Sequence, residues 1–212
     1  MTVEKTSSPA RDIAPVAAAE AVAVSAPRGI AHAEPLDALT SALASGDDHD
    51  LVEAVEAVVE AHAVSALPAL SAIELREAPH SAPAVIDGIA TLANEAGPRE
   101  RREAASTLSR WFLQERHREG IDAAGNTTTL IDALAQTGHR EAIDALVTAL
   151  DEHALPLNNE TLIVQRLAEL RQASAKPAIA RFHARVVAMP STFGVDEELR
   201  REAMAAAHEA LD

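Results

Sequence analysis

The chain has 212 residues, of which 48% are hydrophobic and 2% aromatic, and its formal net charge is -15. It contains no cysteine, which excludes a disulfide scaffold, a cysteine-ligated zinc site and thiol catalysis. No segment approaches the roughly 18 apolar residues that a membrane span needs, so we expect a soluble, cytoplasmic protein without a membrane partner.

Alanine dominates the composition, with 48 positions. Alanine loses no side-chain entropy in a helix, and valine and isoleucine recur at helical spacing instead of alternating as they do in strands. The composition and the spacing together predict an all-α fold whose helices pack through small residues.

The N-terminal part differs from the rest because its prolines are scattered and it has no amphipathic stripe. We expect residues 1–34 to form a disordered, Ala/Pro-rich tail and residues 35–212 to form one helical repeat domain. Residues 13–26 are similar to a secretory signal, but Pro15 and the charged Glu20 interrupt the apolar stretch and argue against secretion.

From residue 35 onward, caps and apolar stripes predict about ten helical segments. Gly46, Gly97 and Gly138 are typical of helix ends, and Pro98 is typical of a helix start. We expect a third segment over about 66–76, a longest one over about 98–118, and a long loop over 120–126. Tight and longer connections alternate, which predicts five helical hairpins at about 36–64, 66–95, 98–137, 139–173 and 176–211.

These hairpins have a period near 36 residues, which is typical of stacked helical repeats. Short internal matches support this register. The segment 140–146 recurs as 176–182, and 129–131 recurs as 161–163.

The segment Gly-His-Arg-Glu-Ala-Ile-Asp-Ala-Leu at 138–146 resembles the first helix of HEAT-like repeats, in particular the short phycobilisome-lyase type. Residues 101–105 and 199–203 are similar to the second-helix pattern, although 101–105 falls in an expected first helix. The resemblance covers roughly residues 35–211. It implies a right-handed α–α superhelix of about five hairpins that binds other proteins, or alternatively an accessory lyase or other enzyme subunit.

Motifs for chemistry are missing from the sequence. No two of the nine histidines have the three- or four-residue spacing of a helical metal site, and there is no nucleophile elbow or phosphate-binding loop. The acidic run 47–50 is typical of a helix N-terminus, and Glu115, His117 and Glu119 are typical of a solvated helix end. We therefore expect a non-enzymatic protein with no catalytic residue, no cofactor and no metal.

Charge is unevenly distributed, with a net charge of -9 over residues 47–98 and +3 over 159–190. The basic residues near the C-terminus predict a surface for an acidic partner segment, although they could instead cover the core and pair with their own acids. Trp111 is a candidate anchor for a partner, or else a core residue. The candidate partner-binding residues are Arg166, Arg171, Lys176, Arg181, Arg185 and Trp111.

Nucleic acid is a poor match for this chain, because the net charge is -15 and the chain has one Trp, no Tyr and three Phe for stacking on bases. Self-association through the repeat ends stays open, although the acidic last helix resembles a polar cap. The function that we expect is a protein-interaction or scaffold module that binds a segment of a partner protein on one face of the repeat stack.

Overall fold

The computed structural model describes residues 33–190 and 195–212. Within this part of the chain it contains ten α-helices, two short 3-10 helices and no strand, which confirms the all-α prediction. The expected N-terminal tail lies almost entirely outside the described residues, and its last two positions, 33 and 34, belong to the first helix.

The helices begin and end as follows. They are α1 (Ala33–Ser45), α2 (Asp48–Glu60), η1 (Val64–Ala66), α3 (Leu67–Ser71), α4 (Ala82–Glu95), α5 (Pro98–Glu115), α6 (Ile121–Thr137), α7 (Arg140–Glu152), α8 (Leu157–Glu169), η2 (Ala173–Ala175), α9 (Lys176–Ala188) and α10 (Val195–Leu211).

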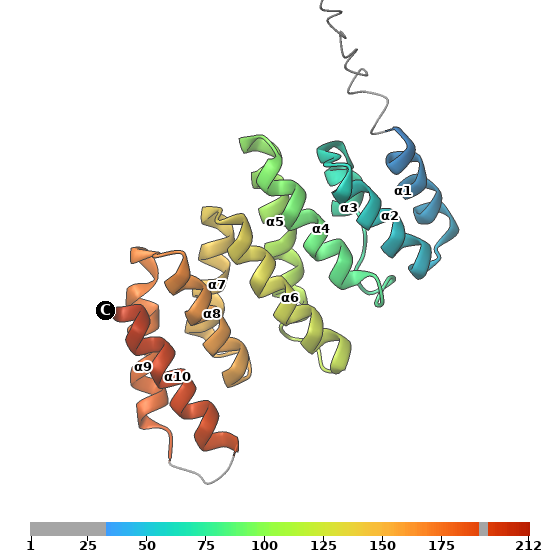
Figure 1. Ribbon diagram of the computed structural model, residues 1–212. Helices are drawn as coiled ribbons and strands as arrows, with labels where there is room; N and C mark the ends of the chain where they lie inside the picture. The colour runs from blue at the N-terminus through green and yellow to red at the C-terminus, as the bar shows by residue number, and fades with distance from the viewer. Residues whose placement is uncertain (1–32, 191–194) are drawn as a thin grey trace, which may run out of the picture.

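The α-helices pack in two rows, and they follow one another from α1 at one end of the molecule to α10 at the other (Figure 1). The even row consists of α2, α4, α6, α8 and α10, and each of these helices packs against the next. In the odd row α3, α5, α7 and α9 do the same, while α1 packs against α2. The two rows enclose one continuous hydrophobic core.

Small side chains set the distance between neighbouring helices, because interaxial distance depends on the residues at the contact. Gly88 is the clearest case. It is buried in α4, and a Cβ atom at its position would lie 2.8 Å from Val55 Cγ1 and 3.4 Å from Val59 Cγ2 of α2. Larger groups fill the space between the rows, where Trp111, Phe112 and Phe182 are all at most 1% exposed.

A backbone feature occurs twice, at the ends of α2 and α8. His62 and Arg171, 109 residues apart, have positive φ values of 53° and 51°. The N–H groups of the next residues, Ala63 and Gln172, donate to the carbonyls of Val58 and Leu167, the six-residue bond of a Schellman motif. In both places a 3-10 turn and a proline-containing helix start follow. The separation is three times the expected period of about 36 residues, so these two connections occupy the same position within their repeats.

The structure corrects two of the expected boundaries. Helix α3 ends at Ser71 and not near residue 76, and an irregular segment that buries Ile73 and Leu75 leads on to α4. Helix α6 begins at Ile121, directly after Gly120, which adopts a φ of 118°, so residues 121–126 of the expected loop are helical.

We predict that alanine substitutions at two helical glycines have opposite effects. Gly88→Ala should destabilise the fold by about 1 kcal/mol or more, because overpacking against the stiff Val55 outweighs the gain in helix propensity. Gly125→Ala in α6 should stabilise by up to about 1 kcal/mol, because nothing lies within 4 Å of the added methyl group. Urea denaturation measures both free energies of unfolding. Stabilisation by Gly88→Ala would contradict the close packing of α4 against α2.

Candidate functional site

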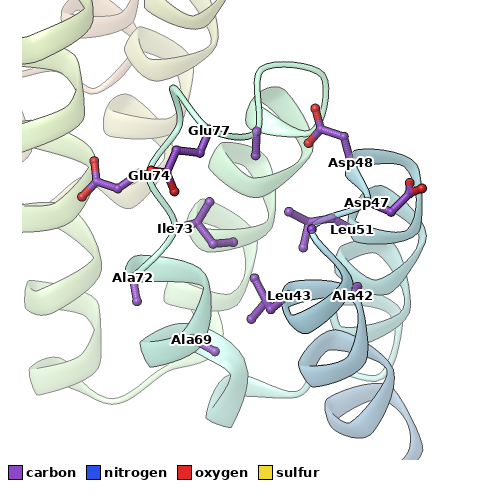
Figure 2. A pocket seen from close by; sticks show the side chains of 12 residues that line it. Ala42, Leu43, Asp47, Asp48, Leu51, Ala69, Ala72, Ile73, Glu74 and Glu77 are labelled. Atoms are coloured by element: carbon purple, nitrogen blue, oxygen red, sulfur yellow. The ribbon is translucent and has the colours of Figure 1, made fainter.

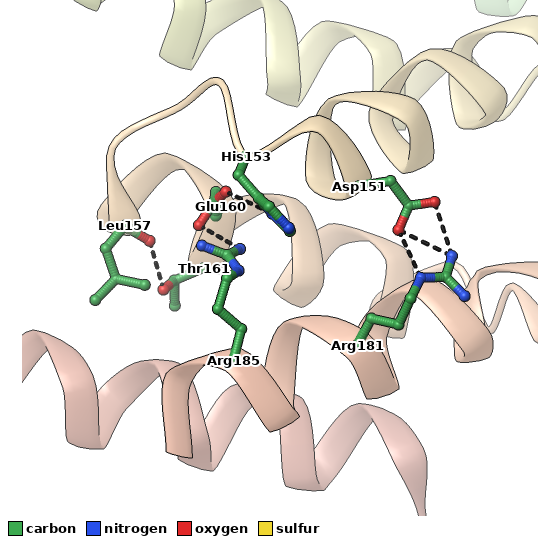
Figure 3. Close-up of polar contacts among 7 residues, drawn as sticks. All are labelled: Asp151, His153, Leu157, Glu160, Thr161, Arg181 and Arg185. Atoms are coloured by element: carbon green, nitrogen blue, oxygen red, sulfur yellow. Dashed lines mark hydrogen bonds and ion pairs between the residues drawn. The ribbon is translucent and has the colours of Figure 1, made fainter. Parts of the chain in front are cut away.

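Three of the expected partner-binding arginines bridge neighbouring helices. Arg166 of α8 donates from Nε to Asp132 Oδ1 of α6 at 2.7 Å. Figure 3 shows the other two, on α9: Arg181 donates to both carboxylate oxygens of Asp151 on α7, and Arg185 donates to Glu160 Oε2 of α8 at 2.8 Å. These side chains pair with the chain's own acids, which is the alternative that the sequence left open.

Glu160 is the most deeply buried member of this group, with a side chain that is 1% exposed. Burial raises the pKa of Glu160, and the bond from Arg185 and the nearby His153 counteract part of this rise. Arg185 also lies over the Phe182 ring, 5.3 Å from its centroid. The pair therefore joins α9 to the start of α8 at a carboxylate that is almost completely buried.

The remaining two basic candidates lie at the C-terminal end of the two rows. Lys176 donates from Nζ to the carbonyl oxygen of Leu211 at 2.9 Å, which ties the start of α9 to the end of α10. Arg171 is exposed and its side chain forms no hydrogen bond or ion pair with the described residues. Of the five basic candidates, Arg171 is thus the one whose guanidinium is unpaired in the described part of the chain.

Trp111 of α5 is 1% exposed and packs in the hydrophobic core between the helices, so it does not contribute to the surface of the described residues.

In the acidic run at residues 47–50, Asp47 caps α2, and Asp48 accepts from the Ser81 hydroxyl and the His80 N–H at 2.6 and 2.9 Å. Burial raises the pKa of Asp48, but these hydrogen bonds outweigh it and hold the pKa below its ordinary value. The run thus acts as a helix N-terminus, as the sequence predicted.

The expected solvated cluster at the end of α5 is partly buried instead. Glu115 is 2% exposed and accepts from Arg118 at 2.7 Å, while His117 is exposed. Among the residues that the structure describes, no group of three or more His, Asp or Glu side chains is placed to hold a metal ion.

The even row presents carboxylates along one face, which the sequence analysis missed. Shallow grooves lie between α2 and α4, between α6 and α8, and between α8 and α10, and small residues such as Ala84, Ala135 and Ala205 line them. At least one acidic residue from every even-row helix borders a groove, and we call this surface the even-row face. Its acidic residues are Glu56, Asp87, Asp132, Glu169, Glu202 and Glu209.

These acids differ in how far they are neutralised. Arg166 pairs with both Asp132 and Glu169. Glu56, Asp87 and Glu202 form no hydrogen bond or ion pair with described residues. Burial raises the pKa of Asp87, and the negative charge of Asp132 on the neighbouring helix raises it further. Negative charge at Asp87 therefore weakens the fold.

Comparisons with known proteins found no matching family model, no similar curated protein and no similar solved structure. In the described residues, no helix combines the length and the apolar character that crossing a bilayer requires.

We predict that the two arginines of α9 contribute unequally to stability. Arg185→Ala should cost roughly 3 kcal/mol, because it leaves the buried Glu160 carboxylate without its hydrogen-bond donor. Arg181→Ala, one helical turn away, should cost at most about 1 kcal/mol, since both members of its pair are more than a third exposed.

The pH dependence gives the Arg185 prediction a second readout. Removing Arg185 raises the pKa of Glu160 further above its unfolded-state value, so the lost stability develops as pH rises through that pKa. Relative to the unchanged protein, the Arg185→Ala variant should lose less stability in acidic than in neutral buffer. An equal loss at both pH values would mean that burial of a charged Glu160 is not the cause.

We also predict that Asp87→Asn stabilises the chain slightly at neutral pH, by a few tenths of a kcal/mol, because the carboxylate is partly exposed and screened. The folded-state pKa of Asp87 is raised, so its charged form weakens the fold as pH rises. The difference in stability between Asp87→Asn and the unchanged protein should vanish below the ordinary pKa of 3.8. Asp37→Asn on α1 is the control and should change nothing. Thermal unfolding at several pH values measures this, and a destabilised Asp87→Asn variant would contradict the repulsion.

Proposed function

We propose that this protein is a non-enzymatic interaction or scaffold module that binds a segment of a partner protein on the even-row face. The observation that carries the proposal is the alignment of carboxylates and shallow grooves on successive helices of one row. A surface of this form suits an extended chain that contacts several repeats in turn.

We further propose that the two rows are a right-handed α–α superhelix of the HEAT-like type. Three features support this interpretation: the hairpin pairing, the contacts between successive helices of the even row and of the odd row from α3 onward, and the connection that recurs after 109 residues. In such a stack the second helices of the hairpins form the inner, concave surface, and here these are the helices of the even row.

The charge of the even-row face favours a basic partner over the acidic partner that the sequence suggested. Arg166, Arg181 and Arg185 already hold carboxylates of this chain, so an acidic segment would have to break those pairs or depend on Arg171, whose guanidinium is unpaired in the described part of the chain. A lysine or arginine placed near Asp87 and Asp132 would instead relieve the repulsion between them. Rim charges of this kind act mainly on association rate and specificity.

Neutralising the unpaired carboxylates tests the proposal without breaking a structural ion pair. We expect the triple variant Glu56→Gln, Asp87→Asn, Glu202→Gln to lose most of its partner binding, because it removes three negative charges from the face and leaves Asp132 and Glu169 with Arg166. Affinity capture from native lysate, quantified by mass spectrometry against the unchanged protein, measures the loss.

A matched triple variant controls for net charge. Asp37→Asn, Glu119→Gln, Glu141→Gln makes the same change in charge and residue type at exposed positions outside the even-row grooves, and it should retain the partner. If both triple variants retain the partner equally well, the even-row face is not the binding site. Equal loss by both would assign capture to overall acidity and not to a specific surface.

A further inference from the structure

A separate pocket of about 270 Å³ lies at the N-terminal end of the two rows, between α1, the start of α2 and the segment that follows α3 (Figure 2). Leu43, Leu51 and Ile73 form its apolar floor together with small alanines. Leu43 is 39% exposed and is one of four large apolar side chains that are exposed among the described residues. The volume is below the range of about 300–1,000 Å³ for small-molecule sites, and it suits one or two amino-acid side chains.

The shortness of α3 explains why this pocket exists. Helix α3 has five residues, whereas the other odd-row helices have 13 to 18. Residues 72–81 replace the missing turns, held in place where His80 and Ser81 bond to Asp48. Because no helix continues along α1 at this point, Leu43 is left exposed, whereas Leu51 and Ile73 stay buried.

The margin of the pocket is acidic. Asp47 and Asp48 lie on one side, and Glu74 and Glu77 lie on the segment after α3 (Figure 2). The side chains of Glu74 and Glu77 form no hydrogen bond or ion pair with the described residues, and both residues are exposed. No basic residue lines the pocket, and residues 47–98 contain one basic residue, Arg76, against ten acidic ones.

We propose that this pocket binds a cationic amphipathic segment of a partner protein. One large apolar side chain of that segment enters between Leu43, Leu51 and Ile73, and flanking lysines or arginines face Glu74, Glu77 and Asp47. Charge complementarity selects this occupant: an apolar floor alone accepts many side chains, but four carboxylates around it disfavour an acidic segment and favour a basic one.

The test measures binding of a labelled peptide to the full chain by fluorescence anisotropy. The probe is a short synthetic peptide with a central leucine between Lys-Arg pairs, and its partner peptide has alanine in place of that leucine. We expect Ala72→Phe, which fills the pocket from an exposed position at the end of α3, to weaken binding at least about tenfold, as the loss of a central anchor does. The alanine peptide should bind the unchanged protein about tenfold more weakly as well.

The charged margin is tested separately. Glu74→Gln, Glu77→Gln should weaken binding severalfold and reduce its dependence on salt, because exposed charge pairs are screened by ions. The control Glu119→Gln, Glu141→Gln makes the same change in net charge elsewhere and should leave binding unchanged. These variants do not touch the even-row face, so this inference and the proposed function can fail independently.

Four results would overturn the inference. The first is the same affinity for the leucine and alanine peptides. The second is a loss of peptide binding in the control Glu119→Gln, Glu141→Gln that equals the loss in Glu74→Gln, Glu77→Gln. The third is a concentration-dependent mass that Ala72→Phe abolishes, which would assign the pocket to a second copy of this chain. The fourth is a nuclear Overhauser effect between the Leu43 methyl groups and residues 1–32 in the peptide-free protein, which would assign it to the N-terminal segment.

Discussion

The close approach of neighbouring helices through small side chains is the constraint on which the rest of this structure depends. Gly88 brings α4 against Val55 and Val59 of α2, and buried alanines occur along both rows. Close packing has a consequence for function, because grooves between tightly packed helices are shallow. A ligand that lies in such grooves gains little from any one of them, so binding depends on several helices at once and on charges at the groove edges.

The same two-row arrangement explains why the arginines near the C-terminus join helices. Their long side chains extend over the alanine-rich surface and reach carboxylates on adjacent helices, 25 to 34 residues away in the sequence. The deepest of these pairs, Arg185 with Glu160, joins α9 to α8 through a hydrogen bond from Arg185 Nη2 to Glu160 Oε2. Charge in this part of the chain thus contributes to the geometry of the rows.

Local signals predicted much of the fold. Gly138 has the left-handed φ of 57° expected of a helix end, Pro98 opens α5, and Asp47 caps α2. The pairing of charges could not be predicted in this way. A local excess of basic residues indicates a charged surface only if no acidic residue from elsewhere in the chain pairs with them. Here Asp132 and Asp151 lie on other helices, so the sequence does not show that they neutralise the arginines. The carboxylates of the even-row face could have been found by aligning the second helices of the five hairpins.

The boundary that sequence periodicity misplaced, the end of α3, is also the one that changes the surface most. Apolar residues continue at helical spacing as far as Ile73, and Leu75 follows two positions later. Both are buried, but an irregular backbone buries them after the helix has ended. Periodicity records which side chains meet the core and cannot distinguish a helix from a loop that does the same. Because α1 and α2 keep their full length, the shortened α3 of the odd row leaves Leu43 open to solvent, and the acidic residues around it determine which segment can cover it.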